Sequence, residues 1–440
     1  MSTETTVQTE PLWRDEEHRI KSGKTLRAAT AGFFIDMYDV YLPVVALVPA
    51  IAYFAATDAS SQQKATLAGA IFAVSLIGRP IGSIIFGYLG DRIGRRQATV
   101  YAAAGFTICT GLIAVLPGYS TIGGWAAVLL VLLRLVDGVF LGGEYSAANP
   151  LAMEYAPKSR RGMYGAIINA GYPAALGAIT LVTMLTLMVF EAGDASAPYS
   201  VWGWRIPFAI GFVMSAYVFF HYLYSVPESE VWNVNETKGN PLKLLLAPKN
   251  RRAMFISFVT ATGGYVAVNG AVGAYAAHFK HLEIATNTIN TAMLISSVVA
   301  VVLFPLLGMA GQRYGRREMF VVLGLFNLII TPSALAVAIL NPENATTVVV
   351  ASVIAIVGAI SVWSQITAYI MEMFPASVRS SGYGISYSLP SILPAFYPYI
   401  FIAFGLFMDY DLAPVLFVAI GGALLLIGSK ISSDLRDVEM

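Results

Sequence analysis

The chain is short of charged residues and of cysteine. Asp, Glu, Lys and Arg make up only 12% of its 440 residues, whereas they account for about a quarter of a soluble domain. The net charge of +1 gives no reason to expect a nucleic-acid partner. The single cysteine, Cys109, excludes a disulfide within the chain. These shortages exclude a soluble globular protein of ordinary composition.

Apolar residues take the place of the missing charges. They form 57% of the chain, and twelve stretches approach or exceed the roughly 20 apolar residues that span a bilayer. We expect membrane spans at 27–53, 65–88, 98–117, 124–148, 164–190, 203–225, 253–278, 288–310, 318–340, 346–371, 382–406 and 412–430. The sequence therefore predicts an all-α, multi-pass membrane protein that lives in a lipid bilayer.

Two loop sequences occur twice in the chain. GDRIGRR at 90–96 recurs as GQRYGRR at 311–317, and EYAPKSRRG at 154–162 recurs as EMFPASVRSSG at 372–382. The offsets are about half the chain length, which indicates two related halves. We expect two six-helix pseudo-repeat bundles, and the expected domains are a tail at 1–26, a bundle at 27–225, a linker at 226–252, a bundle at 253–430 and a tail at 431–440.

The distribution of basic residues predicts the orientation. With twelve spans, 22 of the 27 lysines and arginines fall on the side of both termini, and only Lys64 and Lys280 fall on the other. Basic residues accumulate on the cytosolic side of membrane proteins. Both termini are therefore expected in the cytosol. The polar N-terminal stretch has no apolar segment typical of a signal peptide, so we expect no cleaved leader.

Six ionisable side chains fall inside predicted spans of the first half, and none falls well inside a span of the second. They are Asp36, Asp39, Arg79, Arg134, Asp137 and Glu144. At about 3 kcal/mol for each ionised residue near the bilayer centre, their burial would cost about 18 kcal/mol, more than a typical fold's stability of about 5–15 kcal/mol. They must pair, face water or be neutral, which is what a proton-coupled carrier requires.

Each of these groups has two possible roles. Asp36 and Asp39 lie on one helical face and either satisfy an arginine or titrate, because burial favours the neutral acid and an arginine favours the ionised one. Arg79 and Arg134 either complete such pairs or bind a substrate carboxylate through two hydrogen bonds. We prefer Asp36 as the proton-coupling acid. Glu144 suits gate pairing better than proton transport.

Asp137 lies one turn after Arg134 and can neutralise it. We retain Asp36, Asp39, Asp137 and Glu144 as candidate proton-coupling residues.

Gly78, Gly82, Gly138 and Gly142 have the spacing that lets two membrane helices approach closely. Three prolines at four-residue intervals, Pro390, Pro394 and Pro398, should kink the eleventh span.

Several motifs together resemble the metabolite:proton symporter family of the major facilitator superfamily. The motifs are DMYDVY at 36–41, RPIG at 79–82, GYLGDRIGRR at 87–96, RLVDGVFLGGEYSAA at 134–148, EYAPKSRRG at 154–162, WGWRIPF at 202–208 and EMFPASVRSSG at 372–382. Three residues depart from the family pattern. Asp36 replaces a common Glu and Met37 a usual Trp, which concerns substrate preference, and Gln312 replaces an Asp, which weakens the second-half gate.

The resemblance implies a central cavity that opens alternately to the two sides, with gates built from the repeated loops. Asp91 would face the N-terminal end of helix 11, Arg95 would engage acids near the end of helix 4, Glu154 would pair with Arg160 or Arg161, and Glu372 with Arg379. We expected such pairs to be exposed and worth about 0–1 kcal/mol each. The gating candidates are Asp91, Arg95, Arg96, Glu154, Arg160, Arg161, Arg316, Glu372 and Arg379.

Analogy with the family places helices 1, 4, 7 and 10 around the cavity, with helix 11 nearby. The candidate substrate-binding residues are Arg79, Arg134, Tyr38, Tyr41, Tyr145, Tyr265, Asn269, Trp363, Gln365, Tyr369, Tyr383 and Tyr387. The four histidines lie at or beyond span ends and do not cluster, and the sequence contains no nucleotide-binding loop or catalytic triad. We therefore expect no metal, no cofactor and no enzymatic activity.

The cargo is less constrained than the fold. Two arginines within the membrane favour the import of a small mono- or dicarboxylate with protons, and a zwitterionic osmolyte or a polyol is the alternative. Export by proton antiport is less favoured, because Tyr172 separates the Gly171 and Pro173 that exporters usually have adjacent. Channels and sensors lack support in the sequence. Localisation in the cell membrane and a monomeric state are expected by analogy.

Overall fold

The computed structural model describes residues 16–230 and 240–438, and all regular structure in these ranges is helical. The α-helices are α1 (Glu16–Tyr41), α2 (Ser61–Ile93), α3 (Arg95–Ala114), α4 (Tyr119–Ile122), α5 (Trp125–Glu154), α6 (Arg161–Asn169), α7 (Gly171–Val189), α8 (Arg205–Tyr224), α10 (Pro241–Leu245), α11 (Pro248–Val268), α12 (Tyr275–His281), α13 (Thr286–Tyr314), α14 (Arg316–Leu325), α15 (Thr331–Leu340), α16 (Ala345–Ser361), α17 (Trp363–Met373), α18 (Arg379–Ser388), α19 (Ile392–Ala395), α20 (Tyr397–Phe404) and α21 (Ala413–Ile431). Residues 1–15 of the predicted tail, 231–239 of the predicted linker and 439–440 lie outside the described residues.

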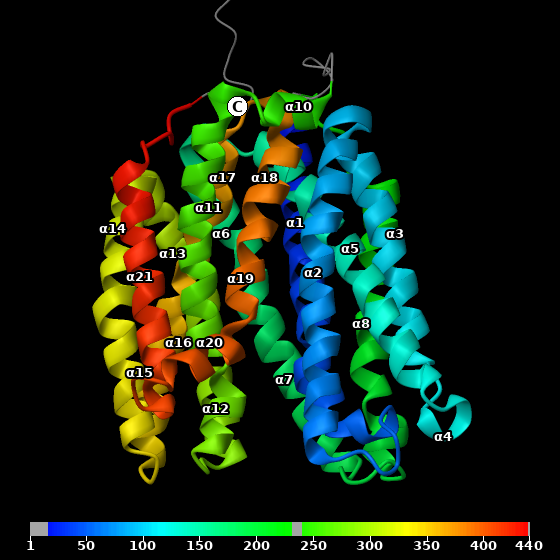
Figure 1. Ribbon diagram of the computed structural model, residues 1–440. Coiled ribbons are helices and arrows are strands. Elements are labelled where there is room, and N and C mark those ends of the chain that lie inside the picture. Colours follow the sequence, from blue (N-terminus) through cyan, green and yellow to red (C-terminus); the bar gives the residue numbers. More distant parts are fainter. Residues whose placement is uncertain (1–15, 231–239, 439–440) are drawn as a thin grey trace, which may run out of the picture.

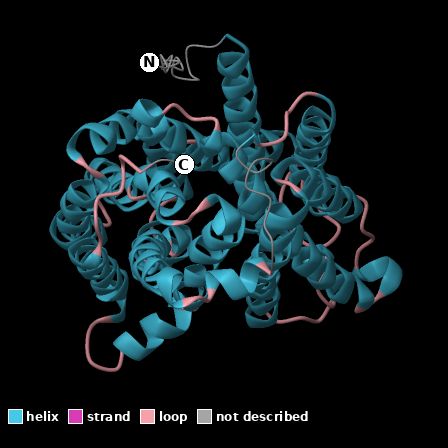
Figure 2. Cartoon of the chain, turned by 90° about the horizontal axis from the view of Figure 1, so that it is seen from above, coloured by secondary structure: helices cyan, strands magenta, loops and turns pink. Residues whose placement is uncertain are grey.

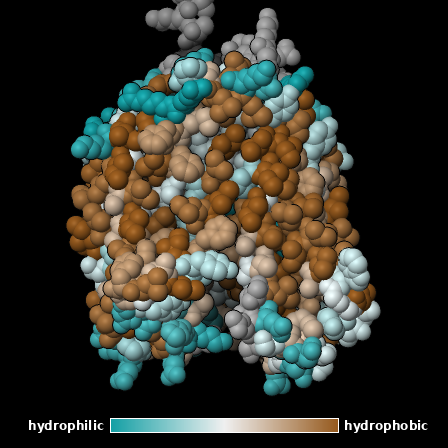
Figure 3. Space-filling view, in the orientation of Figure 1, coloured by the Kyte–Doolittle hydropathy of each residue, from teal (hydrophilic) through white to brown (hydrophobic). Residues whose placement is uncertain are grey.

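The helices are long and apolar enough to cross a bilayer. Among the described residues, eleven helical spans pass a test of length and hydropathy, and a bent pair in α18–α20 brings the number to twelve. Every predicted span coincides with one or more of the helices. A broad apolar band covers the side of the molecule between two polar ends (Figure 3). The protein is therefore a multi-pass membrane protein, as its composition predicts.

The helices form two groups that stand side by side (Figure 1). Helices α1–α8 make one group and α11–α21 the other. Seen from above, the helices lie side by side and many are viewed along their axes (Figure 2). The ends of α5 and α17, together with α10, lie at the top of Figure 1, which we call the predicted cytosolic end.

Several predicted spans are interrupted rather than continuous. The first begins at Glu16, eleven residues before the predicted start, and passes from α1 into a π-helical turn at Leu42–Leu47 and a 3-10 segment at Val48–Tyr53. Pro43 and Pro49 near the starts of these two segments lack the N–H groups that a regular helix would use. The predicted kink in the eleventh span is confirmed, since Ala376–Ala395 and Tyr397–Phe404 meet at 43°.

The repeated loop motif has the same backbone geometry in both halves. Gly94, between α2 and α3, has φ of +110°, and Gly315, between α13 and α14, has φ of +113°. A side chain disfavours this left-handed region, so glycine is required where each helix pair turns. The duplication seen in the sequence is therefore also a duplication of local structure.

Glycines bring α2 and α5 into close contact. A Cβ atom on Gly78 would stand 2.5 Å from the carbonyl oxygen of Leu135, and one on Gly138 would stand 2.9 Å from the Cα atom of Ser75 and closer still to its carbonyl oxygen. The small-residue spacing predicted this close packing. Its consequence is that the arginines and acids of these two helices lie within the same buried region as α1.

Candidate transport site and gate

A buried ion pair joins α1 to α2 beside the interface of the two halves. Arg79 Nη2 lies 2.5 Å from Asp36 Oδ2, and Asp36 is fully buried. The guanidinium also lies over the ring of Tyr145, 5.1 Å from its centroid. Arg79 Nε and Asp36 Oδ1 make no hydrogen bond with the described residues. Both partners thus retain unused hydrogen-bonding capacity.

Arg134 is held much more completely than Arg79. Its Nη1 lies 2.7 Å from Asp39 Oδ2 and 2.9 Å from Asp137 Oδ2, and its Nη2 donates to the backbone carbonyl of Asp39 at 3.1 Å. Asp39 also accepts a hydrogen bond from the Thr110 hydroxyl at 3.1 Å. This guanidinium already has two carboxylate partners, which makes it a poor receptor for a third. Asp137 lies beside Arg134, as predicted.

Glu144 has no such partner. It is fully buried on α5, and neither of its carboxyl oxygens makes a hydrogen bond or ion pair with the described part of the chain. Among the six ionisable groups predicted inside the spans, four buried carboxyl groups thus face two buried guanidiniums, Arg79 and Arg134. An unpaired charge costs several kcal/mol in such a place. We expected Glu144 to pair with basic loop residues, but it lies too deep in the helix packing to reach them.

A small cavity lies between the two halves and is lined in part by Arg79. Its wall is formed by Met37, Val40, Tyr41, Phe72, Leu76, Arg79, Asn169, Tyr172, Tyr265, Val268, Asn269, Gly273, Trp363, Tyr387 and Ser391. Arg79 is the only ionisable cation among these residues, and the second half supplies aromatic and neutral polar groups.

The structure places half of the predicted substrate-binding residues on this wall. They are Arg79, Tyr41, Tyr265, Asn269, Trp363 and Tyr387. The aromatic rings of Tyr265, Trp363 and Tyr387 form one cluster, with centroids 4.5 Å apart for Tyr265 and Trp363 and 5.3 Å apart for Trp363 and Tyr387. A ligand held by Arg79 would therefore meet an aromatic surface.

The other predicted substrate-binding residues do not line the cavity. They are Arg134, Tyr38, Tyr145, Gln365, Tyr369 and Tyr383. Gln365 turns toward α13 and donates to the carbonyl of Leu307 at 2.7 Å, and Tyr369 donates to the Ser432 hydroxyl at 2.8 Å. Tyr38 donates to the carbonyl of Pro207 at 3.3 Å. We expected these side chains at the cavity because their helices border it, but each points to another face of its helix.

Tyr172 and Asn169 line the cavity without having been predicted to do so. The Tyr172 hydroxyl accepts a hydrogen bond from Tyr41 at 3.0 Å, and the two rings stack. Tyr172 is the residue that separates Gly171 from Pro173 in α7. This interruption could have predicted that Tyr172 lines the cavity, because a tyrosine between the glycine and the proline adds a polar group where the helix is broken.

A set of polar contacts joins the halves beside the cavity. Tyr145 and Ser388 share a hydrogen bond of 2.6 Å, and Asn149 donates to the Tyr383 hydroxyl at 2.8 Å. Asn169 donates to the Thr367 hydroxyl at 2.5 Å. All these groups are buried. Tyr145 and Tyr383 therefore join the halves rather than line the cavity.

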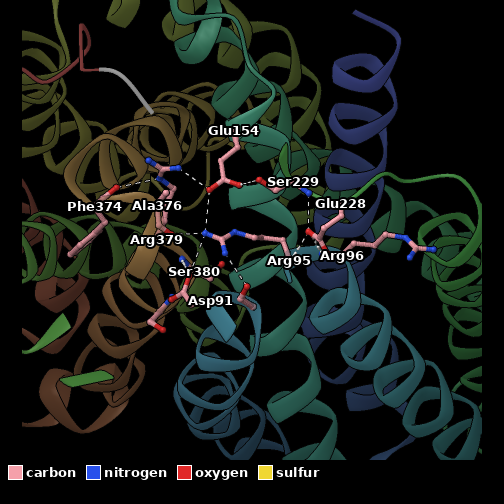
Figure 4. Close-up of polar contacts among 12 residues, drawn as sticks. Asp91, Arg95, Arg96, Glu154, Glu228, Ser229, Phe374, Ala376, Arg379 and Ser380 are labelled. Carbon is pink, nitrogen blue, oxygen red and sulfur yellow. Dashed lines mark hydrogen bonds and ion pairs between the residues drawn. The ribbon is translucent and has the colours of Figure 1, made fainter. Parts of the chain in front are cut away.

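Glu154, at the end of α5, is the centre of a buried ionic cluster at the predicted cytosolic end (Figure 4). Arg95 Nη2 lies 3.3 Å and Arg379 Nη1 lies 2.8 Å from its Oε1 atom, and the Ser229 hydroxyl donates to its Oε2 atom. We expected Glu154 to pair with Arg160 or Arg161. That expectation is wrong because Arg379 approaches from the other half, and the pairs are buried rather than exposed.

Asp91 fastens the start of α18 to the end of α2. Its two carboxylate oxygens accept hydrogen bonds from the backbone N–H groups of Ser380 and Ser381, at 3.0 Å and 2.9 Å. A helix N-terminus has free N–H groups and a partial positive charge that favour a carboxylate. Arg95 adds a hydrogen bond of 2.6 Å to the carbonyl of Ala376. The contacts of Asp91 and Arg95 therefore join the first half to the second.

The second half repeats this arrangement with a weaker group. Gln312 takes the place of Asp91 in the repeated motif, and its carbonyl accepts from the backbone N–H of Gly162 at 3.0 Å and from Arg316 at 2.7 Å. Arg316 pairs with Glu372 at 2.9 Å. We expected Glu372 to pair with Arg379, which the structure corrects, since Arg379 turns to Glu154.

Arg96, Arg160 and Arg161 lie outside these cross-links. Arg96 donates to the carbonyls of Tyr222 and Leu223 within the first half. Arg161 donates to the carbonyl of Val438. Arg160 is exposed. Arg96 thus holds α3 against α8, and Arg161 reaches the C-terminal segment.

The predicted linker contributes residues that the sequence did not single out. Glu228 accepts hydrogen bonds from the backbone N–H groups of Arg95 and Arg96, at 2.9 Å and 3.1 Å, and so caps the start of α3. Asp434 has the corresponding position at α14, where it accepts from the N–H of Arg316 at 3.4 Å. The sequence does have an acid shortly after the last helix of each half, which could have predicted these two caps. However, Glu228 and Asp434 are not separated by the same number of residues as the other repeated motifs.

Buried ion pairs, a cavity between two helix bundles and ionic contacts that join the bundles at one end are the features of a membrane transporter of small molecules. The chain belongs to the Major Facilitator Superfamily, whose family model matches residues 29–398.

Its relatives are transport proteins. The chain is 31% identical to the inner membrane metabolite transport protein YhjE of Escherichia coli K12, over 94% of each chain. It is 29% identical to the ectoine/proline transporter ProP of Corynebacterium glutamicum, over 87% of this chain and 79% of the other. It is 28% identical to the alpha-ketoglutarate permease of Escherichia coli K12, over 83% of each. The protein is thus a metabolite transporter and not an enzyme.

The fold has solved counterparts. A structure of the proton:xylose symporter XylE superposes with a TM-score of 0.76 at 18% identity and covers 95% of this chain and 98% of that one.

Proposed function

We propose that the protein imports a small organic acid together with protons, with both termini in the cytosol of the cell and as a monomer. The observation that carries this proposal is the position of Arg79. It is the one cation on the cavity wall, it has a single carboxylate partner, and its Nε atom is unused. A guanidinium of this kind binds a carboxylate through two parallel hydrogen bonds.

Competition for Arg79 would couple the substrate to a proton. A substrate carboxylate that binds Arg79 displaces Asp36, which is fully buried and has no second arginine. A displaced Asp36 cannot remain charged in an apolar site without a large penalty, so it takes up a proton. Loss of the substrate reverses both events, because Asp36 then regains Arg79. Substrate and proton are therefore bound and released together.

A zwitterion is the second candidate, and the aromatic cluster favours it. Tyr265, Trp363 and Tyr387 could receive a quaternary ammonium group by cation–π attraction while Arg79 holds the carboxylate. Among the relatives, one is named for alpha-ketoglutarate and another for ectoine and proline. The same arginine serves both classes of substrate.

Uptake into proteoliposomes tests the proposal. Labelled 2-oxoglutarate, shikimate, proline and glycine betaine are offered with and without an inward proton gradient. We expect gradient-driven accumulation of at least one carboxylate, and collapse of accumulation by a protonophore. If none of the four compounds accumulates above equilibration, proton symport of these classes is refuted.

Variants assign the roles. Asp36→Asn should keep exchange of internal for external substrate and lose concentrative uptake, because an amide cannot release a proton; unaltered accumulation would place the proton site elsewhere. Arg79→Lys should raise KM, since an ammonium cannot form the two parallel hydrogen bonds. Arg134→Lys is the matched control, and it should reduce the yield of folded protein more than it changes KM, because Arg134 holds two buried aspartates.

A further inference from the structure

Of the four buried acids within the described spans of the first half, Glu144 is the one whose charge has no direct partner. It is fully buried, and both carboxyl oxygens lack a hydrogen bond within the described chain. Asp36, Asp39 and Asp137 each lie next to an arginine. An ionised carboxylate without a partner in such a site is penalised by several kcal/mol, and the neutral acid avoids most of that penalty.

Gly32 on α1 provides the space that the Glu144 side chain occupies. A Cβ atom on Gly32 would stand 3.0 Å from Glu144 Cδ and closer still to one carboxyl oxygen. The absence of a side chain at residue 32 therefore makes the space that the carboxyl group occupies. Gly32 lies on α1 one helical turn, about 6 Å along the axis, before Asp36, so the Glu144 carboxyl group packs against the same face of α1 that carries Asp36.

The groups around Glu144 belong to four other helices or to its own. Asp36 on α1 and Arg79 on α2 are the charged residues that act on it. Three tyrosines also interact electrostatically with Glu144. They are Tyr222 of α8, Tyr145 of α5 and Tyr383 of α18. The Tyr222 hydroxyl is itself buried without a hydrogen-bond partner. Arg79 is committed to Asp36, so no cation is left for Glu144.

We infer that Glu144 is a second proton-binding residue, which stores a proton while the predicted cytosolic end is closed and passes protons from Asp36 toward that end. This inference rests on the proposed symport, because it assigns the next step after Asp36. When the gate opens, water reaches Glu144 and its proton leaves. When the substrate leaves Arg79, the O–H bond of Asp36 breaks, a new O–H bond forms on the Glu144 carboxylate, and Asp36 regains its charge and its arginine.

The direction of this relay follows from the chain. Asp36 belongs to the pair at the cavity wall, whereas Glu144 lies ten residues before Glu154, the centre of the gate. Ten residues of helix span about 15 Å. Gly32 likewise lies on the side of Asp36 that leads to the start of α1. Glu144 therefore stands between the cavity and the gate.

Infrared spectroscopy of the purified protein in lipid tests the stored proton without any substrate. At neutral pH the wild type should show the carbonyl stretch of a protonated carboxylic acid in dry surroundings. Glu144→Gln should remove one component of this band. Glu343→Gln, a change at an exposed loop residue, is the matched control and should leave the band intact. A wild type without the band, or a Glu144→Gln variant with the full band, overturns the inference.

A neutral acid in an apolar site should tolerate neutral replacements, so Glu144→Gln and Glu144→Met should both fold. Failure of both to fold would show that the charge is required and would also overturn the inference. For the relay, labelled 2-oxoglutarate, or the panel compound that the wild type accumulates, is followed in proteoliposomes. Glu144→Gln should retain measurable counterflow while gradient-driven uptake falls to equilibration. Wild-type accumulation, or loss of counterflow in folded protein, contradicts the relay.

The experiments distinguish a failure of the symport proposal from a failure of the proposal that Glu144 binds a proton. If no panel compound is accumulated, the symport proposal fails, while the infrared band still decides whether Glu144 holds a proton. If symport is found and the band is absent, Asp36 alone remains as the proton site.

Discussion

Neutralising Glu154 should open the gate at the predicted cytosolic end. Glu154 is the shared partner of Arg95 and Arg379, at 3.3 Å and 2.8 Å, and the side chains of all three residues are no more than 3% exposed. In Glu154→Gln the two guanidiniums keep their positive charges and lose the carboxylate between them. The closed state then contains two positive charges in a buried site without a carboxylate between them. Separating the halves moves the two charges apart and removes their repulsion.

The size of the effect follows from the burial. Removing one partner of a buried ion pair costs about 3–5 kcal/mol, and about 1.4 kcal/mol corresponds to a tenfold change in an equilibrium constant. The ratio of open to closed molecules should therefore rise by a factor of roughly 100 or more. The same substitution in an exposed pair should change it little, because such pairs contribute about 0–1 kcal/mol.

Distances between two spin labels across the gate provide the assay. Labels on Gln97→Cys and Glu318→Cys, both at exposed positions and one in each half, are introduced in a Cys109→Ser background. Glu154→Gln should shift the distance distribution to longer values. The matched control is Glu230→Gln, which removes one of the two carboxylate partners of Lys21 in a partly exposed pair. An unchanged distribution in Glu154→Gln, or an equal shift in both variants, refutes the reasoning.

Two further predictions concern the repeated motif. Gly94→Ala and Gly315→Ala should each lower stability by about 1–2 kcal/mol, because both glycines have left-handed φ values; thermal unfolding in detergent measures this, and Gly23→Ala, with nothing near the added methyl group, should cause no loss. Gln312→Ala should open the gate less than Glu154→Gln does, because the bond that it removes between the halves is the neutral one from the Gly162 N–H, worth about 1 kcal/mol, whereas its bond from Arg316 lies within the second half; an equally large opening in the same spin-label assay would contradict this ranking.

The features that were predictable from the sequence are those set along a single helix. The apolar stretches gave the spans because each helix must be long enough to cross the bilayer. Pro390, Pro394 and Pro398 gave the bend of 43° because proline disturbs its own helix. Asp137 lies beside Arg134 because three residues separate them on one helix. Each of these inferences needs only the local geometry of the chain.

The features that were not predictable depend on how helices are rotated and which helix ends meet. Gln365 and Trp363 are two residues apart, yet Trp363 faces the cavity and Gln365 faces α13. The partner of Glu154 is 225 residues away. Nothing in the local sequence distinguishes Arg379 from Arg160 as that partner. The choice is made by the closed arrangement of the two halves.

The two halves of this transporter divide its tasks unequally. The first half holds the six buried ionisable groups that we predicted, and the second presents neutral and aromatic side chains to the cavity. The proposed gate has the same asymmetry, because the charged Asp91 binds two backbone N–H groups of the other half where the neutral Gln312 binds one. Opening this end must therefore break the strong link around Asp91 and Glu154, whereas the link at Gln312 resists little. Movement of α18 away from α2 is the step that should set the rate of opening.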